Sequence, residues 1–343
     1  MQQNKKQPFT NEVRYLAGKT QMKIFHSNQY LLWRVAAVKS IRKIILNADD
    51  FYKDLLPELV WSCDETYSDV FDERQPDYIN QQIRNGWMFE AVAQAEQAIE
   101  DVFSLLKNSS DISFFAKNVV NYRASEVKKY IWNFKSEDLE YVLGEFKLPY
   151  FLLDEAWKAE NVFEEYRNSV LLMQRYIKEL IQFHKNYYLD YCQYKHGMSV
   201  ALLPLGNQKS REEVKREQKK HQDNGFDNNI GSLMTFDNLN VEKRMASSGT
   251  MPQMAMYLTP EIMPYVSRLN KEDNLLYYSM HIVDINEVVS ITEKAYTLIS
   301  VLWANLLKRC DITDEDTIHE WVFPQKDYQK QMVVGFPVDK NTK

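Results

Sequence analysis

The longest regular apolar pattern in the chain lies between Phe163 and Tyr194, and it constrains the fold more than any other feature. Ten residues follow one another at alternating steps of three and four: Phe163, Tyr166, Val170, Met173, Ile177, Leu180, His184, Tyr187, Tyr191 and Tyr194. This spacing places all ten on one stripe of an α-helix, so we expect a helix over about residues 154–196. A stripe of that length requires partner helices, which predicts a mainly α protein built as a multi-helix bundle. Tyr and His fill the last third of the stripe instead of Leu, which disfavours a two-stranded coiled coil.

Shorter apolar patterns and capping signals predict further helices. Pro76 suits a first helical turn, and Asp284 with Glu287 three residues later is typical of a capping box. Ser136, followed by two acids, suits an N-cap, and Gly144 suits the end of the same helix. The predicted helices cover residues 22–46, 76–107, 112–122, 125–134, 136–144 and 284–309, whereas residues 1–20 are expected to fray.

Strand patterns are few and fall late in the chain. Residues 198–205, 253–258 and 275–283 are short apolar runs near Pro or Gly, and together they predict a small antiparallel β insertion. Residues 206–250 are mostly polar and hold four of the nine glycines, which predicts a mobile insertion.

Three regions follow from these patterns. Residues 1–75 form an N-terminal helical region, and residues 76–310 form the bundle with its insertion. Residues 311–343 form a short helix from Thr313 and an extended apolar tail over Met332 to Val338.

Composition excludes several classes of protein. Nine glycines in 343 residues, with no Gly-x-Gly pair, argue against the P-loop and dinucleotide-binding folds. The chain has no Gly-x-Ser-x-Gly elbow and no His-Glu-x-x-His motif. It has no apolar run long enough for a transmembrane segment, and its polar N-terminus does not resemble a secretory signal. Three widely spaced cysteines suit a reducing, cytoplasmic environment.

Charge is unevenly distributed along the chain. Residues 1–47 carry nine Lys or Arg against one acid, and residues 48–104 carry fourteen acids against three Lys or Arg. These blocks either neutralise each other in the fold or face different partners. Residues 117–135 are basic again and include aromatic residues, which predicts a nucleic-acid surface. The candidate nucleic-acid-binding residues are Lys117, Arg123, Lys128, Lys129 and Lys185.

A polar group closes the longest predicted helix and holds the candidate catalytic residues. His196 lies in the last turn, where it is a candidate general base or acid, and Lys195 is a candidate to hold a phosphate beside it. A purely structural explanation also exists, because a cation in the last turn complements the helix dipole and Gly197 suits the following position. Cys192 and His196 have the spacing of metal ligands, but two ligands do not make a site. We therefore expect no metal and no cofactor.

The Lys195-His196-Gly197 end of a long helix, followed by strands and a final long helix, resembles divergent bacterial HEPN domains (higher eukaryotes and prokaryotes nucleotide-binding). The resemblance covers about residues 76–310. It implies a homodimeric, metal-independent ribonuclease of a toxin or phage-defence system, with His196 as the key residue. The family motif is an Arg, then four to six intervening residues, then the His. Leu189, Asp190 and Tyr191 occupy those positions here, so a member that binds RNA or nucleotide without cleaving it is also implied.

A second reading of the same chain is a non-catalytic helical interaction or scaffold protein that binds a protein partner. Its basis is the length of the apolar stripes, the segregation of charge and the absence of a complete active-site motif. The basic segment 1–47 also permits association with DNA or a membrane surface.

Overall fold

The computed structural model is mainly α-helical, and it describes part of the chain. Structure is described for residues 10–28, 32–47, 76–121, 123–148, 162–195, 200–201, 230–237, 253–256, 277–310, 319–324 and 331–336. The helix expected at Thr313 lies outside these residues. None of the described helices is both long enough and apolar enough to cross a lipid bilayer.

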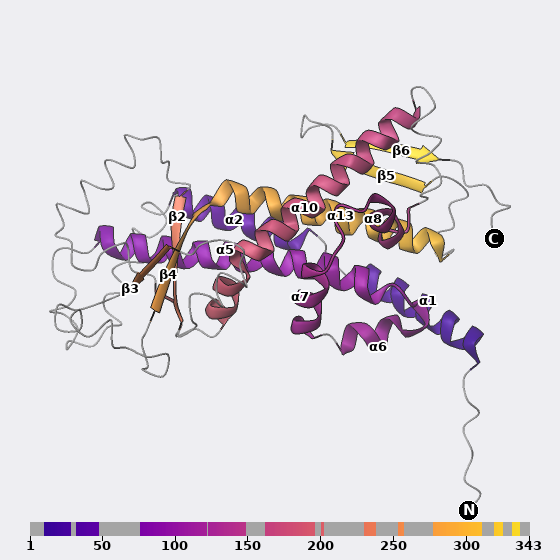
Figure 1. The fold of residues 1–343 in the computed structure, drawn as a ribbon, viewed down its shortest axis with the longest axis horizontal. Helices are drawn as coiled ribbons and strands as arrows, with labels where there is room; N and C mark the ends of the chain where they lie inside the picture. Colours follow the sequence, from indigo (N-terminus) through magenta and orange to yellow (C-terminus); the bar gives the residue numbers. More distant parts are fainter. Residues whose placement is uncertain are drawn as a thin grey trace, which may run out of the picture. The chain divides into compact units, whose positions relative to one another are not determined.

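The chain divides into two compact units. Unit 1 contains Met1–Trp33, Ala98–Gln182 and Glu293–Lys343, and unit 2 contains Arg34–Gln97 and Phe183–Thr292. The three longest helices each contribute to both units, because the divisions fall inside α5 (Pro76–Asn108), α10 (Val162–Lys195) and α13 (Ile285–Arg309) (Figure 1).

The α10 stripe confirms the prediction of a helical bundle. Seven of its ten members are buried: Val170, Met173, Ile177, Leu180, His184, Tyr187 and Tyr191. The start of α13 also follows the prediction, because the Asp284 carboxylate accepts a hydrogen bond from the backbone N–H of Asn286 at 2.8 Å. Periodicity and capping are local properties, which explains why the long helices were predictable.

Unit 1 contains short helices around a dense aromatic core. They are α1 (Asn11–Asn28), a 3-10 turn η2 (Ile112–Phe114), α6 (Phe115–Val120), α7 (Ala124–Trp132) and α8 (Leu139–Glu145). Phe25 packs against Phe115 and Trp303, with ring centroids 5.7 and 6.2 Å apart. A hairpin of β5 (His319–Pro324) and β6 (Gln331–Phe336) is also assigned to this unit, and β6 agrees with the extended tail that we predicted.

The N-terminal helices differ from the prediction. A single helix over residues 22–46 is wrong, because α1 begins at Asn11 and a separate helix, α2 (Trp33–Leu46), follows. The expectation that residues 1–20 fray is therefore wrong from Asn11 onward. The cause is tertiary: a Cβ on Gly18 would overlap the backbone carbonyl of Ile112, so α1 and η2 pack backbone to backbone.

The start of α8 also differs from the prediction. Asp138, not Ser136, is the N-cap, and its carboxylate accepts a hydrogen bond from the backbone N–H of Tyr141 at 3.0 Å. Ser136 and Glu137 form a turn instead, and their carbonyls accept hydrogen bonds from the side-chain amide of Gln174 on α10. This contact between segments far apart in sequence moves the start of the helix.

Unit 2 contains a small antiparallel sheet, as predicted, with one strand that the sequence did not reveal. The sheet has the order β1-β2-β4-β3 (Figure 1). Its strands are β1 (Val200–Ala201), β2 (Ile230–Asp237), β3 (Gln253–Met256) and β4 (Tyr277–Asp284). β2 lies inside residues 206–250, so the prediction of a polar insertion is wrong there. β2 pairs with β4 over its full length, and this pairing overrides its weak, glycine-containing strand pattern.

Candidate functional site

Helix α10 carries charged and polar side chains into the core of unit 2. His184 and Asp190 both have an exposed fraction of 0%. Nδ1 of His184 lies 2.7 Å from Oε2 of Glu96 on α5, and the Glu96 side chain is also completely buried. Because an isolated buried charge is costly, this contact explains how α10 and α5 tolerate two ionisable groups in the core.

A second pair links α10 to the sheet. Nδ1 of His281 on β4 lies 2.6 Å from Oδ2 of Asp190, and the His281 side chain is 18% exposed. The ring of Tyr187 approaches His281 edge-on, with centroids 6.1 Å apart. Burial, with the nearby charges of Glu287, Asp190 and Asp284, raises the pKa of Tyr187. Helix α10 therefore supplies the imidazole of the first pair, His184, and the carboxylate of the second pair, Asp190.

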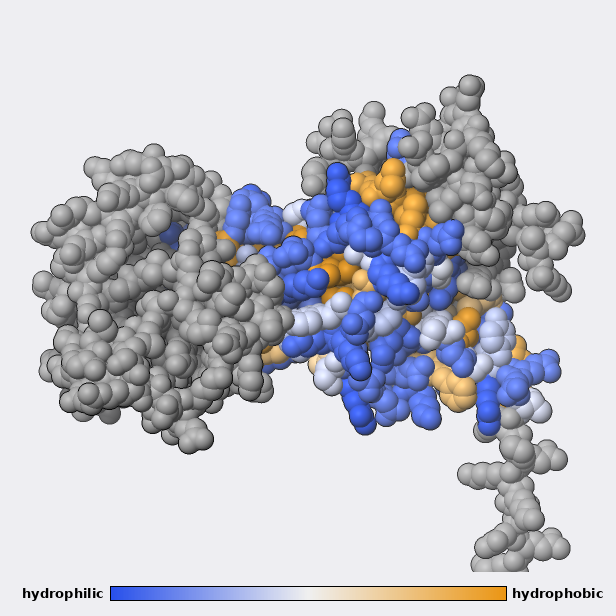
Figure 2. Space-filling view, viewed as in Figure 1, coloured by the Kyte–Doolittle hydropathy of each residue, from blue (hydrophilic) through white to orange (hydrophobic). Residues whose placement is uncertain are grey.

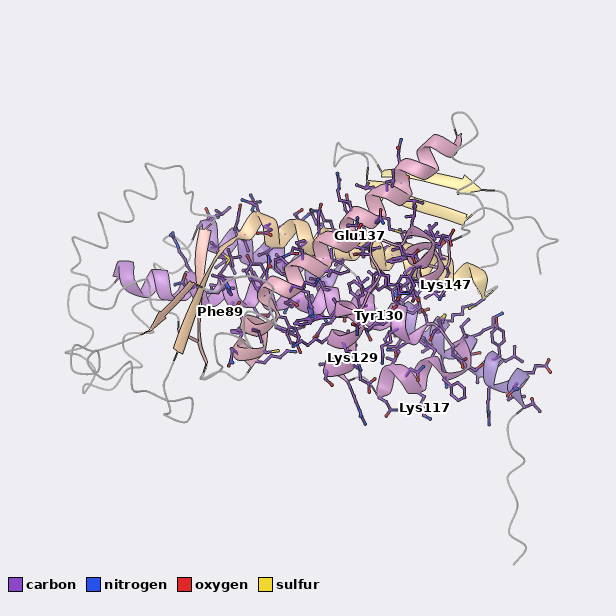
Figure 3. All side chains as sticks on the ribbon, viewed as in Figure 1. Phe89, Lys117, Lys129, Tyr130, Glu137 and Lys147 are labelled. Carbon is purple, nitrogen blue, oxygen red and sulfur yellow. The ribbon has the colours of Figure 1, made fainter. Side chains whose placement is uncertain are left out.

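Aromatic side chains surround the same stretch of α10. The Tyr188 ring lies 4.7 Å from that of His184. The Tyr194 hydroxyl donates a hydrogen bond to Glu90 at 2.8 Å, and burial together with Glu90 raises the pKa of Tyr194 to about 12. Phe89, labelled in Figure 3, stacks on Tyr194 with ring centroids 5.6 Å apart. This stretch of α10 therefore lies in an aromatic environment that is partly shielded from water.

The two His–carboxylate pairs have the first half of the geometry of a catalytic dyad. In such a dyad a carboxylate holds Nδ1 and leaves Nε2 to exchange a proton with substrate. Nε2 of His184 and Nε2 of His281 are both buried, with no hydrogen-bond partner among the described residues. A general base needs its reactive nitrogen within reach of substrate. In this conformation the pairs anchor α10 to α5 and to β4.

Of the two predicted catalytic residues, only Lys195 lies among the described residues, at the end of the same helix. His196 falls outside the described residues. Lys195 is the exposed last residue of α10, and its Nζ lies 3.8 Å from the centroid of the Tyr191 ring. Cys192 is half-buried, and its sulfur forms no disulfide bond with a described cysteine. The described residues contain no cluster of three or more His, Cys, Asp or Glu that would hold a metal ion.

Two of the three positions where the HEPN motif would place its Arg are buried. Asp190 and Tyr191 are buried, and Leu189 is half-buried. Sequence reasoning missed the pairing of Asp190 with His281, and it missed Glu96 entirely. One signal was present, because a His within an apolar helical stripe requires a buried polar partner. Nothing in the sequence identified that partner.

The predicted nucleic-acid residues divide between the two units. Lys185 is a half-buried residue of α10 in unit 2. Lys117, Arg123, Lys128 and Lys129 belong to unit 1, on α6, at the N-cap of α7 and on α7. Figure 3 labels Lys117 and Lys129, whose side chains extend outward from these two helices, and Figure 2 shows mainly hydrophilic surface where α7 lies.

Aromatic rings accompany the lysines of unit 1. Nζ of Lys128 lies 4.8 Å from the centroid of the Trp132 ring, and Nζ of Lys117 lies 5.9 Å from that of Phe114, which is 39% exposed. These are cation–π contacts at distances that stabilise weakly at a surface. We call this set of residues the α6–α7 surface: Lys117, Arg123, Lys128, Lys129, Phe114 and Trp132.

The acid Glu126 lies beside the α6–α7 surface, and a lysine from α5 binds it. The Glu126 carboxylate lies 2.7 Å from Nζ of Lys107 and 3.9 Å from the guanidinium of Arg123. The hydrogen bond from Lys107 and its charge lower the pKa of Glu126. Lys107 therefore binds this carboxylate more closely than Arg123 of the α6–α7 surface does.

Comparison with protein-family models, with curated proteins and with solved structures finds no match for this chain.

Proposed function

We propose that this protein binds RNA, and that the α6–α7 surface is the binding site. The observation that carries the proposal is the interleaving of cations with aromatic rings on two helices that follow one another in one unit. The resemblance of the chain to HEPN domains supports the same function. The buried pairs of unit 2 are assigned a structural role in this proposal.

Each component of the surface has a role in binding. Lys and Arg neutralise phosphates and release the counterions condensed on the nucleic acid, which makes affinity depend on salt. Aromatic rings provide faces on which unpaired bases stack. The ammonium groups of Lys117 and Lys128 lie over Phe114 and Trp132 in the free protein. On binding, each lysine moves to a phosphate and exposes the ring beneath it.

Fluorescence anisotropy with a labelled RNA oligonucleotide tests the proposal. If all four cations contact phosphates of a single strand, the logarithm of the binding constant falls against the logarithm of salt concentration with a slope of about −3. The double variant Lys128→Ala/Lys129→Ala is expected to weaken binding and to reduce the steepness of that slope by about one to two.

Arg175→Ala is the matched control for this experiment. Arg175 is an exposed cation of unit 1 on α10 and lies outside the α6–α7 surface. Equal loss of affinity in the control and in the double variant contradicts the proposed site. Absence of any binding to RNA contradicts the function, and a stoichiometric protein partner without RNA would then favour the scaffold reading.

Cleavage of the bound RNA is the catalytic form of the proposal, with His196 as general base and Lys195 beside the scissile phosphate. The protein and its His196→Ala variant are incubated with cellular RNA in EDTA, because the expected chemistry needs no metal. Cleavage by the wild type alone supports catalysis. Equal cleavage by both proteins, or cleavage by neither, contradicts the catalytic form of the proposal. The protein would then bind RNA without cleaving it. Light scattering of the same samples tests the expected homodimer.

A further inference from the structure

Helix α1 has two apolar faces, and the described residues pack against one of them. Gly18 and Met22 are buried, whereas Val13, Leu16 and Ile24 are 43%, 54% and 58% exposed. The exposed residues recur at helical spacing on the side opposite Gly18 and Met22, with the small residues Ala17 and Thr20 between them. Figure 2 shows apolar residues reaching the surface where α1 and α6 lie.

The inner face of α1 is already covered by other parts of unit 1. Gly18 allows the helix to meet the backbone of η2, and Phe25 packs against Phe115 and Trp303. Burial lowers the pKa of His26, which favours the neutral form of this ring. Because this face fixes α1 in place, the outer face presents its aliphatic residues as a rigid stripe.

Cations border the outer stripe on both sides. Arg14 and Lys23 are exposed on its two flanks, and Nζ of Lys19 lies 5.8 Å from the centroid of the Tyr15 ring. Glu12 is the single acid of α1. Residues 1–10, which precede the helix, contain Lys5 and Lys6 and no acid. The segment as a whole is apolar and basic, so its partner is apolar and anionic.

We propose that the outer face of α1 binds the surface of an anionic lipid bilayer. The helix lies in the plane of the interface, with Val13, Leu16 and Ile24 in the boundary between head groups and acyl chains. Arg14 and Lys23 extend their methylene stems along the apolar layer and hold their charges among lipid phosphates. This proposal is independent of RNA binding, because it uses none of the α6–α7 surface.

Other occupants fit the face less well. A second copy of the chain would bring the same cations together, and three aliphatic side chains cover far less than the roughly 800 Å² per partner of a stable protein interface. Protein interfaces are also depleted in Lys and enriched in aromatic residues at their centre. Binding to a bilayer needs no shape complementarity. Its strength increases with the apolar area that is buried and with the attraction of positive charge to anionic lipids.

Cosedimentation with vesicles tests the proposal on the full chain. Vesicles of phosphatidylcholine with about 30% phosphatidylserine are compared with vesicles of phosphatidylcholine alone, since binding requires the anionic lipid. Leu16→Glu/Ile24→Glu is expected to weaken binding to the anionic vesicles by about tenfold or more, because each change removes apolar burial and adds a repelled charge. Far-UV circular dichroism verifies that the variant remains folded.

Two controls make the outcome decisive. Leu171→Glu changes a leucine of unit 1 on α10 that is 41% exposed, and it is expected to bind vesicles like the wild type. Lys128→Ala/Lys129→Ala is also expected to keep most of its lipid binding, which separates this site from the RNA surface. Absence of binding to the anionic vesicles, or equal loss in Leu171→Glu, overturns the proposal. A lipid-free dimer that Leu16→Glu/Ile24→Glu abolishes also overturns it and assigns the face to a second copy.

Discussion

The two units place contacts between a basic and an acidic side chain, nearly equal in length, in opposite environments. In unit 1, Nζ of Lys178 lies 2.6 Å from Oε2 of Glu137, and these side chains are 38% and 83% exposed. In unit 2, Nδ1 of His184 lies 2.7 Å from Oε2 of Glu96, and both side chains are fully buried. Glu137, the more exposed of the two residues in unit 1, is labelled in Figure 3. Distance alone therefore says little about what a pair does.

The difference in burial separates structural charges from charges that remain available to a partner. Water screens an exposed pair, so its net contribution to stability is about 1 kcal/mol or less. Removing one member of a buried pair leaves the other uncompensated, which costs about 3–5 kcal/mol. We infer that the buried charges of unit 2 hold elements together, whereas the exposed cations of unit 1 can bind an anionic ligand without loss of stability.

The largest expected effect comes from breaking the buried pair of unit 2. Glu96→Gln keeps the shape of the side chain and removes its charge, and it is expected to lower the free energy of unfolding by about 3–5 kcal/mol. Glu137→Gln, in the exposed pair of unit 1, is the matched change and is expected to cost about 1 kcal/mol or less. Urea unfolding followed by circular dichroism measures both. Similar losses of unfolding free energy in the two variants would contradict the difference that we infer between buried and exposed pairs.

A smaller loss of stability is expected when the contact between the sheet and α10 is weakened. Asp190→Asn weakens a charged hydrogen bond to His281, whose side chain is partly exposed, and is expected to cost about 2–3 kcal/mol. Hydrogen exchange should increase in β4, because that strand loses its link to the helix. Unchanged protection over residues 277–284 would show that His281 does not anchor the sheet.

Two glycines test whether unit 1 depends on close packing instead of buried charge. Gly18→Ala forces a Cβ against the carbonyl of Ile112 and is expected to destabilise the protein by about 1–3 kcal/mol. Gly144→Ala on α8 meets no atom within 4 Å and is expected to stabilise it by up to about 1 kcal/mol, because Ala is the better helix former. Thermal unfolding distinguishes the two signs, and destabilisation by both would refute the packing argument.

The smallest effect concerns the exposed pair beside the α6–α7 surface. Lys107 lowers the pKa of Glu126 below its usual 4.5. A carboxylate with a lowered pKa stabilises the folded state at pH values above its unfolded pKa, and this contribution is lost as pH falls through the folded pKa. The free energy of unfolding of Glu126→Gln should therefore be closest to that of the wild type in acid. Near neutral pH it should be slightly lower. Chemical unfolding at a series of pH values, at low and high salt, measures this difference, and a difference that grows toward acid would contradict it.

Part of the fold followed from local patterns. The apolar stripe of α10, the proline at the start of α5 and the cap of α13 are read within one or two helical turns, and the structure confirms all three helices. The boundaries of α1 and α8 were not predictable, because contacts with Ile112 and Gln174 decide them. β2 was missed because its pairing with β4 outweighs its own weak pattern.

The candidate sites show the same division. The basic and aromatic residues of the α6–α7 surface are close in sequence, so composition alone singled out the cations. Glu96 and His184 are 88 residues apart, and Asp190 and His281 are 91 residues apart, so neither pair leaves a local signal.

The sequence by itself determined that the protein is a mainly α bundle with long apolar stripes, because helical periodicity is encoded within each helix. Only the tertiary structure decided which charges are buried and which remain exposed. Burial depends on what other segments bring against a residue, and His184 with Glu96, compared with Lys178 and Glu137, shows that the same contact distance carries different energies in these two settings.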